Sequence, residues 1–499
     1  MSKSMIKGFI VMLLTLTLLL SLCVHIEVNA IDKDEFSFHL NERINYLMRY
    51  YDIPGVSIAL IEEGEVVWVN AYGYADVEQQ REMTTDTVCR VQSISKSVTA
   101  WGVLRLAEDG LIDLDSPVKK YINSWNFPIS DQSYNEITVR QLLTHTSGLV
   151  LGDVMDQYPI DAPIPSLRDN LTKEARFFQK PGQSFSYSNV GYNLLELMVE
   201  DVTSQTFEEF MSKEVLAPLK METATFVWNE EINPEVPVGY NTKGEPVPVY
   251  VYPEKASGGL FASVEDVAHF VAAGMSDNPV LSSESLLEMY DPAVTVKGVY
   301  RYVSSWYGLG HFIEVSSQGL KAVWHGGQGN GLMTHFHAIP ETGDGIVILT
   351  NSQRSWPMIS YILRDWTEWN SYDSVGMSNI VYAIFGFQIV IGFIVLIVLW
   401  QLSRLVLGVF TGSRKFTLIS RKFSLSRLLQ VTVFIILSAV LYWSGTRDYL
   451  FLTSVFPVLS IWLGRAVLSV ATVSLLSAYL PEHSNDNDVY FNRRQYLNE

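Results

Sequence analysis

Hydrophobic and polar residues alternate in two different ways near the start of the chain. Between Asp34 and Tyr51 the apolar residues recur every three or four positions, which predicts an amphipathic helix. The next run, Val56–Ile61, is apolar and rich in β-branched residues, and the polar stretch 62–65 separates it from Val66–Val69. Two such runs around a glycine-containing turn predict a β-hairpin. The opening pattern is therefore a helix followed by two paired strands.

Helical patterns dominate the middle of the chain. The apolar-rich run Val98–Glu108 is followed by Gly110, a common helix terminator. A short helix is predicted at Thr138–Leu143 and a longer one at Val190–Thr203. Because residues 116–230 are largely helical with long loops, we interpret them as a helical subdomain inserted into a sheet domain.

Strand patterns return after the helical region. Trp324–His337 is a strand candidate that contains several glycines, and Ile346–Thr350 has the uninterrupted apolar character of a buried strand. The turn-forming sequence 340–345 precedes this second strand, and a last helix is predicted at Met358–Trp369. Strands at both ends of residues 31–370 indicate one sheet domain.

Three apolar runs occupy the C-terminal part of the chain. The first, Ile380–Trp400, is long enough to cross a bilayer and has Gln388 as its one strongly polar residue. The other two are residues 428–444 and 451–480, the last of which contains Pro457 and Arg465. So few polar residues within the runs disfavour a transporter.

Charges around the apolar runs predict an orientation. Residues 1–30 have the order of a secretory signal peptide, namely lysines, an apolar stretch and small residues, and an uncleaved signal anchor is the alternative. The loop 401–427 has no acidic residue and carries Arg404, Arg414, Lys415, Arg421, Lys422 and Arg427. The positive-inside rule places this loop in the cytoplasm. We therefore expect a cell-membrane protein with an extracytoplasmic catalytic domain and a cytoplasmic C-terminus. The expected parts are a signal peptide (1–30), the catalytic domain (31–370), a linker (371–379), about three membrane helices (380–480) and a cytoplasmic tail (481–499).

Charge and cysteine content exclude several classes of function. The formal net charge is −18 although the loop 401–427 is basic, so the region before the apolar runs is strongly acidic. Such a region cannot neutralise phosphates, which excludes nucleic acid as a partner. Removal of residues 1–30 would leave Cys89 as the only cysteine, so no internal disulfide is expected. His335 and His337 share a strand face without a carboxylate or cysteine at ligand spacing, and we predict no metal and no cofactor.

Candidate chemistry begins at Ser93-Ile94-Ser95-Lys96. The spacing places Lys96 one helical turn from Ser93 on the same face. A desolvated lysine can take the proton of a serine hydroxyl and make it a nucleophile. The same spacing recurs at Ser4/Lys7 and Ser116/Lys119, and taken alone it describes a helix-capping serine followed by a solvated lysine.

Two further short motifs follow in order, Tyr187-Ser188-Asn189 and His325-Gly326-Gly327. Singly they describe a core tyrosine, a helix cap and a structural histidine. Together the three motifs resemble those of the penicillin-recognising serine hydrolases, in the branch of class C β-lactamases, D-Ala-D-Ala carboxypeptidases and related esterases. The resemblance covers about residues 35–370 and extends to the flanking stretches 142–149, 307–310 and 340–343. It implies an α/β fold with a mainly antiparallel sheet, helices on both faces and a helical subdomain, here followed by α-helical membrane segments.

The resemblance also implies roles for individual residues. Ser93 would be the nucleophile, with Lys96 and Tyr187 as the candidate bases. Asn189 would hold Lys96 and contact the acyl amide of the substrate. The substrate-binding residues His325, Gly327 and Gln328 would lie on an edge strand beside Ser93, where the glycine lets an extended substrate pair with the strand. The oxyanion hole would be the backbone N–H groups of Ser93 and Gln328.

Three departures from the family pattern bear on the substrate. His325 stands where many β-lactamases have lysine, Gln92 stands where glycine is frequent, and the acidic residue that class A enzymes use for deacylation has no counterpart. A carboxylate-bearing substrate should then be favoured only while the imidazole is charged. The expected substrates are cell-wall D-amino-acid peptides, β-lactams, or related amides and esters. A sensor of β-lactams or cell-wall fragments with slow turnover, and an esterase for neutral esters, are the alternatives.

Overall fold

A nine-stranded sheet, antiparallel at every pairing, forms the centre of the domain in the computed structural model. The structure describes residues 33–128, 134–152, 157–228, 236–418, 424–447 and 450–482. The strand order is β10-β11-β12-β13-β14-β15-β1-β2-β3. Strands from the two ends of the domain are neighbours, since Val56 pairs with Thr350. The strands are β1 (Gly55–Glu62), β2 (Glu65–Asp76), β3 (Arg81–Glu82), β10 (Val294–Thr295), β11 (Trp306–Tyr307), β12 (Phe312–Val315), β13 (Lys321–Gly329), β14 (Leu332–Ile339) and β15 (Asp344–Thr350).

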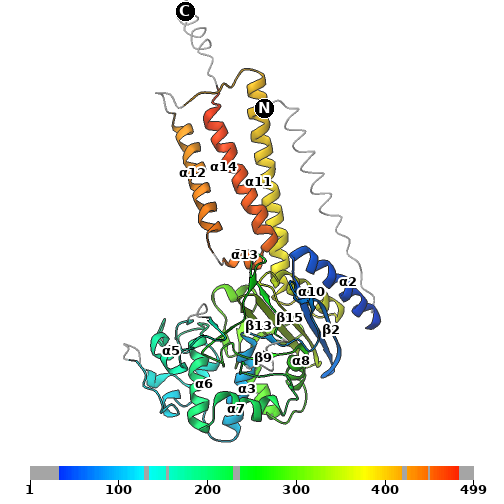
Figure 1. The fold of residues 1–499 in the computed structure, drawn as a ribbon, viewed down its shortest axis with the longest axis vertical. Coiled ribbons are helices and arrows are strands. Elements are labelled where there is room, and N and C mark those ends of the chain that lie inside the picture. Colours follow the sequence, from blue (N-terminus) through cyan, green and yellow to red (C-terminus); the bar gives the residue numbers. More distant parts are fainter. Residues whose placement is uncertain are drawn as a thin grey trace, which may run out of the picture.

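Helices cover both faces of this sheet (Figure 1). Side chains alternate along β1, so Ile58 packs with α2 (Lys33–Tyr51) and α10 (Trp356–Trp369). Ala59 faces the opposite way, into the core formed with α3 (Ile94–Glu108) and α8 (Val264–Ala273). The predicted α/β class and the predicted terminal helices and hairpin are confirmed.

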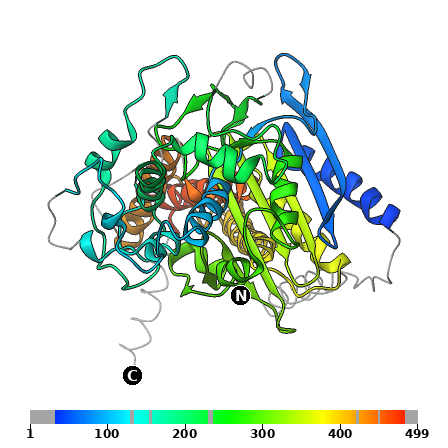
Figure 2. The ribbon, with the colours of Figure 1, turned by 90° about the horizontal axis from the view of Figure 1, so that it is seen from below.

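The helical subdomain lies between β4 (Cys89–Arg90) and β9 (Phe261–Ala262) in the sequence, and on one side of the sheet in space (Figure 2). The helices predicted at Thr138–Leu143 and Val190–Thr203 are both present. The first, α4, begins after a capping box at Thr138, and the second, α6, ends at Thr203. The remaining elements of the domain are η1 (Val118–Lys120), η2 (Tyr134–Glu136), α4 (Val139–Leu143), β5 (Tyr158–Pro159), α5 (Leu167–Glu174), α6 (Asn189–Thr203), α7 (Phe207–Met211), η3 (Ser212–Leu216), β6 (Gly239–Tyr240), β7 (Pro246–Val247), β8 (Tyr250–Val251), α9 (Ser283–Met289) and η4 (Gly298–Tyr302).

The strand candidate predicted within residues 324–337 is present, as part of a hairpin. The stretch 324–337 is not a single strand, because β13 and β14 form a hairpin that turns at Asn330-Gly331. Gly331 has a φ of 83°, a left-handed conformation that glycine adopts without strain. An Asn-Gly pair between two apolar runs is a strong hairpin signal, and the sequence interpretation overlooked it.

Three helices of the C-terminal region are long and apolar enough to cross a membrane, and they form a stalk on the domain (Figure 1). They are α11 (Ser378–Phe410), α12 (Leu425–Gly445) and α14 (Pro457–Tyr479), and the short α13 (Phe451–Val455) precedes the last of them. The apolar core of the sheet and α10 continues into this region through Val375, Met377 and Ile380. The predicted signal peptide and residues 483–499 of the predicted tail lie outside the described residues.

Candidate active site

Ser93 lies at the junction between β4 and α3, as the N-cap residue of that helix. The residue before it, Gln92, has a φ of 54°, in the left-handed region that glycine favours. The Gln92 side chain is buried, and its amide hydrogen-bonds to Tyr250 Oη and Tyr252 Oη. These contacts stabilise the turn before the nucleophile, at a position where glycine is frequent in the family.

Lys96 lies one turn along α3 and is completely buried. Its Nζ is 3.2 Å from Ser93 Oγ and donates to the backbone oxygen of Ser257 at 2.5 Å. No carboxylate among the described residues forms an ion pair with it. Burial therefore lowers the pKa of Lys96 well below its usual value. A neutral amine next to a hydroxyl can accept its proton.

Tyr187 approaches Ser93 from the helical subdomain, and the two side chains share a hydrogen bond. Lys96 Nζ lies 5.0 Å from the centre of the Tyr187 ring. Burial, together with the neighbouring Tyr300, raises the pKa of Tyr187 well above its usual value, against the lowering effect of Ser93. At neutral pH this phenol carries its proton, so it can donate one.

Asn189 is the first residue of α6, after Ser188, whose Oγ accepts from Gly191 N at 3.0 Å. Its backbone N–H donates to the Leu151 oxygen at 2.8 Å. Within the described part of the chain its side chain makes no hydrogen bond, and the expected contact with Lys96 is replaced by the contact between Lys96 and Ser257. The Asn189 amide is half-buried and close to the other two motif residues in sequence.

The strand β13 supplies a free edge beside Ser93. Among the described strands, its pairing with β12 ends at Trp324, opposite Phe312, and beyond that point residues 325–329 pair with β14 alone. A Cβ on Gly327 would overlap Val91 O and lie 2.8 Å from Gln92 Cβ. Only glycine lets this strand lie so close to the turn before the nucleophile. The Gln328 side chain is exposed, and its Oε1 accepts from Trp356 Nε1 at 3.2 Å.

His325 is 1% exposed and differs from a cationic lysine in its surroundings. Its Nδ1 lies 2.9 Å from the Gly326 oxygen and its Nε2 lies 3.2 Å from Tyr307 Oη. A proton on Nδ1 satisfies the carbonyl, which leaves Nε2 to accept from the tyrosine. Burial and the nearby Lys96 lower the pKa of His325 well below its usual value. The imidazole is thus neutral at neutral pH, and the expectation of a charge that reads a carboxylate does not fit this environment.

Comparison with known proteins identifies the family. A family model described as Beta-lactamase matches residues 40–361. This chain belongs to that family. Family members include β-lactamases and D-alanine carboxypeptidases, both serine hydrolases, and the chain's membership was predicted from the three motifs.

Curated relatives and solved structures agree with this assignment. Protein flp of Staphylococcus aureus (strain MRSA252) is 28% identical to this chain over 312 residues, which is 60% of each protein. Penicillin-binding protein 4* of Bacillus subtilis is 29% identical over 206 residues, which is 40% of this chain and 43% of the relative. The chain thus spans less than two thirds of these relatives. The octameric penicillin-binding protein homologue from Pyrococcus abyssi is 30% identical, with a TM-score of 0.55 over 64% of this chain and 74% of that one. A class C β-lactamase has the same fold at 21% identity, with a TM-score of 0.55 over 65% and 93%.

Sequence reasoning missed the position of one histidine beside the three motifs. His145 was not among the candidate site residues, yet the centroid of its buried ring lies 4.2 Å from that of Tyr187. Its Nδ1 accepts from the Ser188 N–H at 3.1 Å. It therefore fixes the backbone of the second motif. The loop 142–149 was a local signal for this residue, but its packing against Tyr187 depends on long-range folding.

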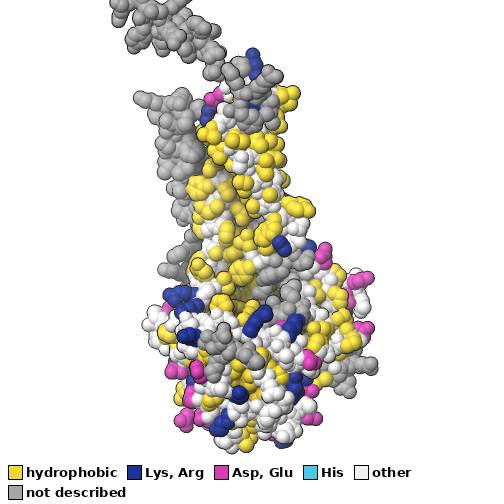
Figure 3. All heavy atoms as spheres, turned by 90° about the vertical axis from the view of Figure 1, so that its left-hand side faces the viewer, with side chains coloured by type: hydrophobic (Ala, Val, Ile, Leu, Met, Phe, Trp, Pro, Cys, Tyr) yellow, Lys and Arg dark blue, Asp and Glu magenta, His cyan; other side chains and the backbone are white. Residues whose placement is uncertain are grey.

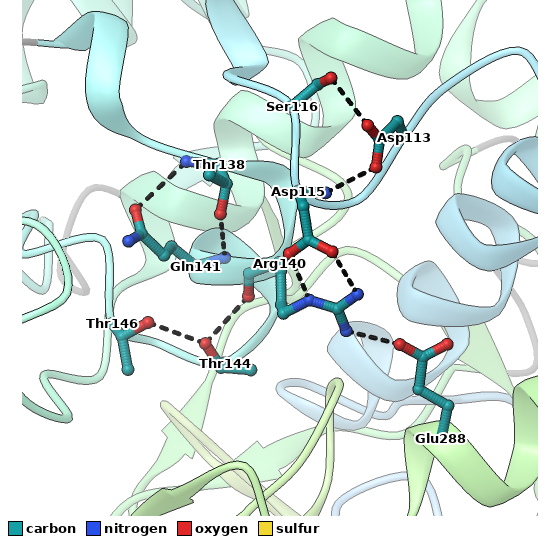
Figure 4. Close-up of polar contacts among 9 residues, drawn as sticks. All are labelled: Asp113, Asp115, Ser116, Thr138, Arg140, Gln141, Thr144, Thr146 and Glu288. Atoms are coloured by element: carbon teal, nitrogen blue, oxygen red, sulfur yellow. Dashed lines mark hydrogen bonds and ion pairs between the residues drawn. The ribbon is translucent and has the colours of Figure 1, made fainter.

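The second Ser-x-x-Lys pair within the described residues has a different environment. Ser116 donates to Asp113 Oδ2 at 3.0 Å in an exposed turn, as Figure 4 shows. In the same view Arg140 pairs with Asp115 at 2.7 Å and with Glu288 at 2.6 Å. This turn is an acidic and basic surface network in which Ser116 is a local hydrogen-bond donor and not a nucleophile next to a desolvated amine.

Proposed function

We propose that the protein is a membrane-anchored serine hydrolase that works through an acyl-enzyme on cell-wall D-amino-acid peptides or related amides and esters. The observation that carries this proposal is the contact between Ser93 Oγ and the buried Lys96 amine, which forms no ion pair among the described residues. Membership of a family of serine hydrolases agrees with it.

In the acylation step, Lys96 Nζ takes the Ser93 proton as Oγ attacks the substrate carbonyl. The N–H groups of Ser93 and Gln328 stabilise the oxyanion. As the intermediate collapses, the Tyr187 hydroxyl gives its proton to the leaving group and regains one from the Lys96 ammonium. Water then attacks the acyl-enzyme by the same route in reverse, its proton passing to the amine and the Ser93 oxygen being reprotonated.

Substrate binding follows from the free edge of β13. An extended acyl chain can pair with the backbone of residues 325–329, as an added strand does. The Asn189 amide, with no hydrogen-bond partner among the described residues, would meet the amide of the acyl group. Both contacts place the reacting carbonyl against Ser93.

A neutral-ester esterase is the second candidate, and the environment of His325 favours it. A buried neutral imidazole offers no positive charge to a substrate carboxylate. Substrates without a carboxylate would then bind no less tightly than peptides that have one.

The domain would face the outside of the cell. The end of the stalk far from the domain includes Arg414, which forms an ion pair with Glu482 at 2.5 Å, and Arg427, which donates to the Ala478 oxygen at 2.8 Å. Basic residues at that end support a cytoplasmic location for it.

Active-site labelling tests the nucleophile. A fluorophosphonate or penicillin probe should add one label to the full-length protein, and intact mass should show that Ser93→Ala abolishes it. Ser116→Ala is the matched control and should keep the label, because this half-buried serine donates to Asp113 and Lys119 at the matching position is exposed. Labelling that survives Ser93→Ala would refute the assignment.

A further inference from the structure

The stalk helices mark where a membrane surface would meet the domain. On α11, Tyr382 and Trp400 are both exposed, and 18 residues of helix separate them by about 27 Å. That spacing is close to the thickness of a bilayer core, and aromatic side chains prefer its two boundaries. Tyr442 and Trp443 lie exposed at the domain end of α12, which packs on α14. The boundary on the domain side is therefore near Tyr382.

A short segment of the domain is fixed at the same level. We call residues 297–303 the interface segment. Asn379 Nδ2, one helical turn before Tyr382, donates to the Tyr302 oxygen at 2.8 Å. Gly376 packs so closely on the oxygen of Val303 that a Cβ there would overlap it. The start of α11 thus holds this segment next to the membrane boundary.

The outward side of the interface segment has the composition of a lipid-contacting surface. Val299 is 55% exposed and Tyr302 is 76% exposed. Lys297 and Arg301 are exposed between and beside them. Apolar and aromatic side chains interleaved with cations suit a headgroup layer that contains anionic lipids. Figure 3 shows Lys and Arg side chains around the junction of stalk and domain.

The inward side of the same segment is a wall of the candidate active site. The Tyr300 ring stacks on Tyr187 at 5.3 Å. Tyr187 in turn shares a hydrogen bond with Ser93. A single residue therefore separates the membrane-facing side chains from the residues that would perform the reaction.

A second path connects the site with the stalk. Ser454, in α13, donates to the Gln353 oxygen at 3.2 Å, and Gln353 Nε2 donates to the Gly329 oxygen at 3.0 Å. Gly329 is the last residue of the free edge of β13 and packs on the Gln92 side chain. Two parts of the site rim, on β13 and on η4, are thus held by residues that begin or join the stalk helices.

We propose that this site acts on substrates held in the membrane, that is, on acyl esters or amides carried by a lipid, with the interface segment seated in the headgroup layer. The inference rests on the proposed hydrolase function and names the substrate class. A lipid-carried acyl group would reach Ser93 along Tyr300 without leaving the membrane surface.

Fluorescence quenching tests the seating without any turnover. The full chain with Cys23→Ser and Val299→Cys is labelled with bimane and placed in vesicles of phosphatidylcholine, phosphatidylglycerol and a headgroup-nitroxide lipid; Cys89 is buried and should not react. We expect strong quenching at position 299. Leu111→Cys is the control, because it is 52% exposed in the loop after α3, a helix that lies in the part of the domain away from the stalk (Figure 1). Equal quenching at the two positions would overturn the proposal.

Substrate presentation tests the consequence for activity. Wild-type protein in vesicles is given a soluble aryl ester and the same aryl ester linked to a lipid in the bilayer. Val299→Asp with Tyr302→Asp should lower turnover of the lipid-linked ester about tenfold and change that of the soluble ester less than about twofold. Leu287→Asp, a change at a 70% exposed leucine on α9, should affect neither.

The two proposals fail in different ways. Suppose that the wild type cleaves the soluble ester. If it does not cleave the lipid-linked ester, or if the double variant loses turnover of both esters equally, the membrane-held substrate is refuted and the hydrolase function stands. If neither ester is cleaved and Ser93 takes no label, the hydrolase fails, and the quenching result still decides whether the interface segment contacts lipid.

Discussion

Lys96 combines a cationic side chain with a position that disfavours positive charge. At neutral pH the unfolded chain carries this lysine protonated, whereas burial in the folded protein lowers its pKa and disfavours the charged form. Because the folded pKa is below the unfolded one, this shift costs stability at every pH below the usual lysine pKa. The residue is accordingly expected to favour reactivity over stability.

Lys96→Met should abolish acyl-enzyme formation and raise Tm by about 2–4 °C at pH 7. The gain should shrink as pH rises toward about 10.5, since the lysine is then neutral in both states. Scanning calorimetry of the detergent-solubilised protein at pH 6, 7, 8 and 9.5 measures it. A gain that is independent of pH would show that Lys96 is protonated in the folded state.

Gln92 is a second residue whose effect on the stability of the protein can be measured. Its left-handed φ of 54° is unfavourable for a side chain with a Cβ, while its amide bonds to Tyr250 and Tyr252 stabilise the turn. Gln92→Ala keeps the strain and loses the bonds, whereas Gln92→Gly loses both. We expect Gln92→Gly to be more stable than Gln92→Ala by about 1 kcal/mol, as measured by thermal unfolding. The reverse order would show that this φ is not strained.

At the scale of elements, local patterns predicted much of the fold. Periodicity located α2, α3, α6 and α10, and helical spacing alone brings Ser93 and Lys96 together. The β13–β14 hairpin was missed because glycines hid its period. Ser257, Tyr300 and His145 reach the site from three distant segments, and no local pattern records contacts that depend on the packing of subdomain against sheet.

The close approach of β13 to the turn before Ser93 requires glycine at position 327, which a substitution can test. Gly327→Ala should lower kcat/KM about a hundredfold, because the new methyl must displace backbone at Val91. Gly326→Ala is the matched control: its methyl would meet the outer end of the Trp356 ring at 2.9 Å, which can move more easily. Steady-state hydrolysis of an aryl ester compares them. Similar losses in both variants would argue that the spacing at Gly327 is not special.

At the scale of the whole molecule, the domain and the stalk share one apolar core. Ile380, Ile384 and Leu459 from the stalk helices are buried in the same cluster as Ile58 of β1 and Ile359 of α10. The connection 371–379, expected as a linker, includes the buried residues Val375 and Met377 and the first residues of α11. This packing fixes how the site lies relative to the stalk, which no pattern in the sequence indicated.

The orientation can be measured with single cysteines in a Cys23→Ser background. Ser413→Cys lies in the exposed turn after α11, and Leu111→Cys lies in the domain. An impermeant thiol reagent on intact cells should label position 111 and spare position 413, with permeabilised cells labelling both as the control. Labelling of position 413 in intact cells would reverse the predicted topology.

The pairing of β1 with β15 has a consequence for synthesis. About 300 residues separate the two strands, so at ~5–20 residues per second a ribosome needs about 15–60 s between them. During this interval the apolar faces of α2 and β1 lack the partners that bury them in the finished protein. The early part of the chain must therefore be protected from aggregation until β15 and α10 have been made, and a chaperone that holds nascent chains would be the natural means.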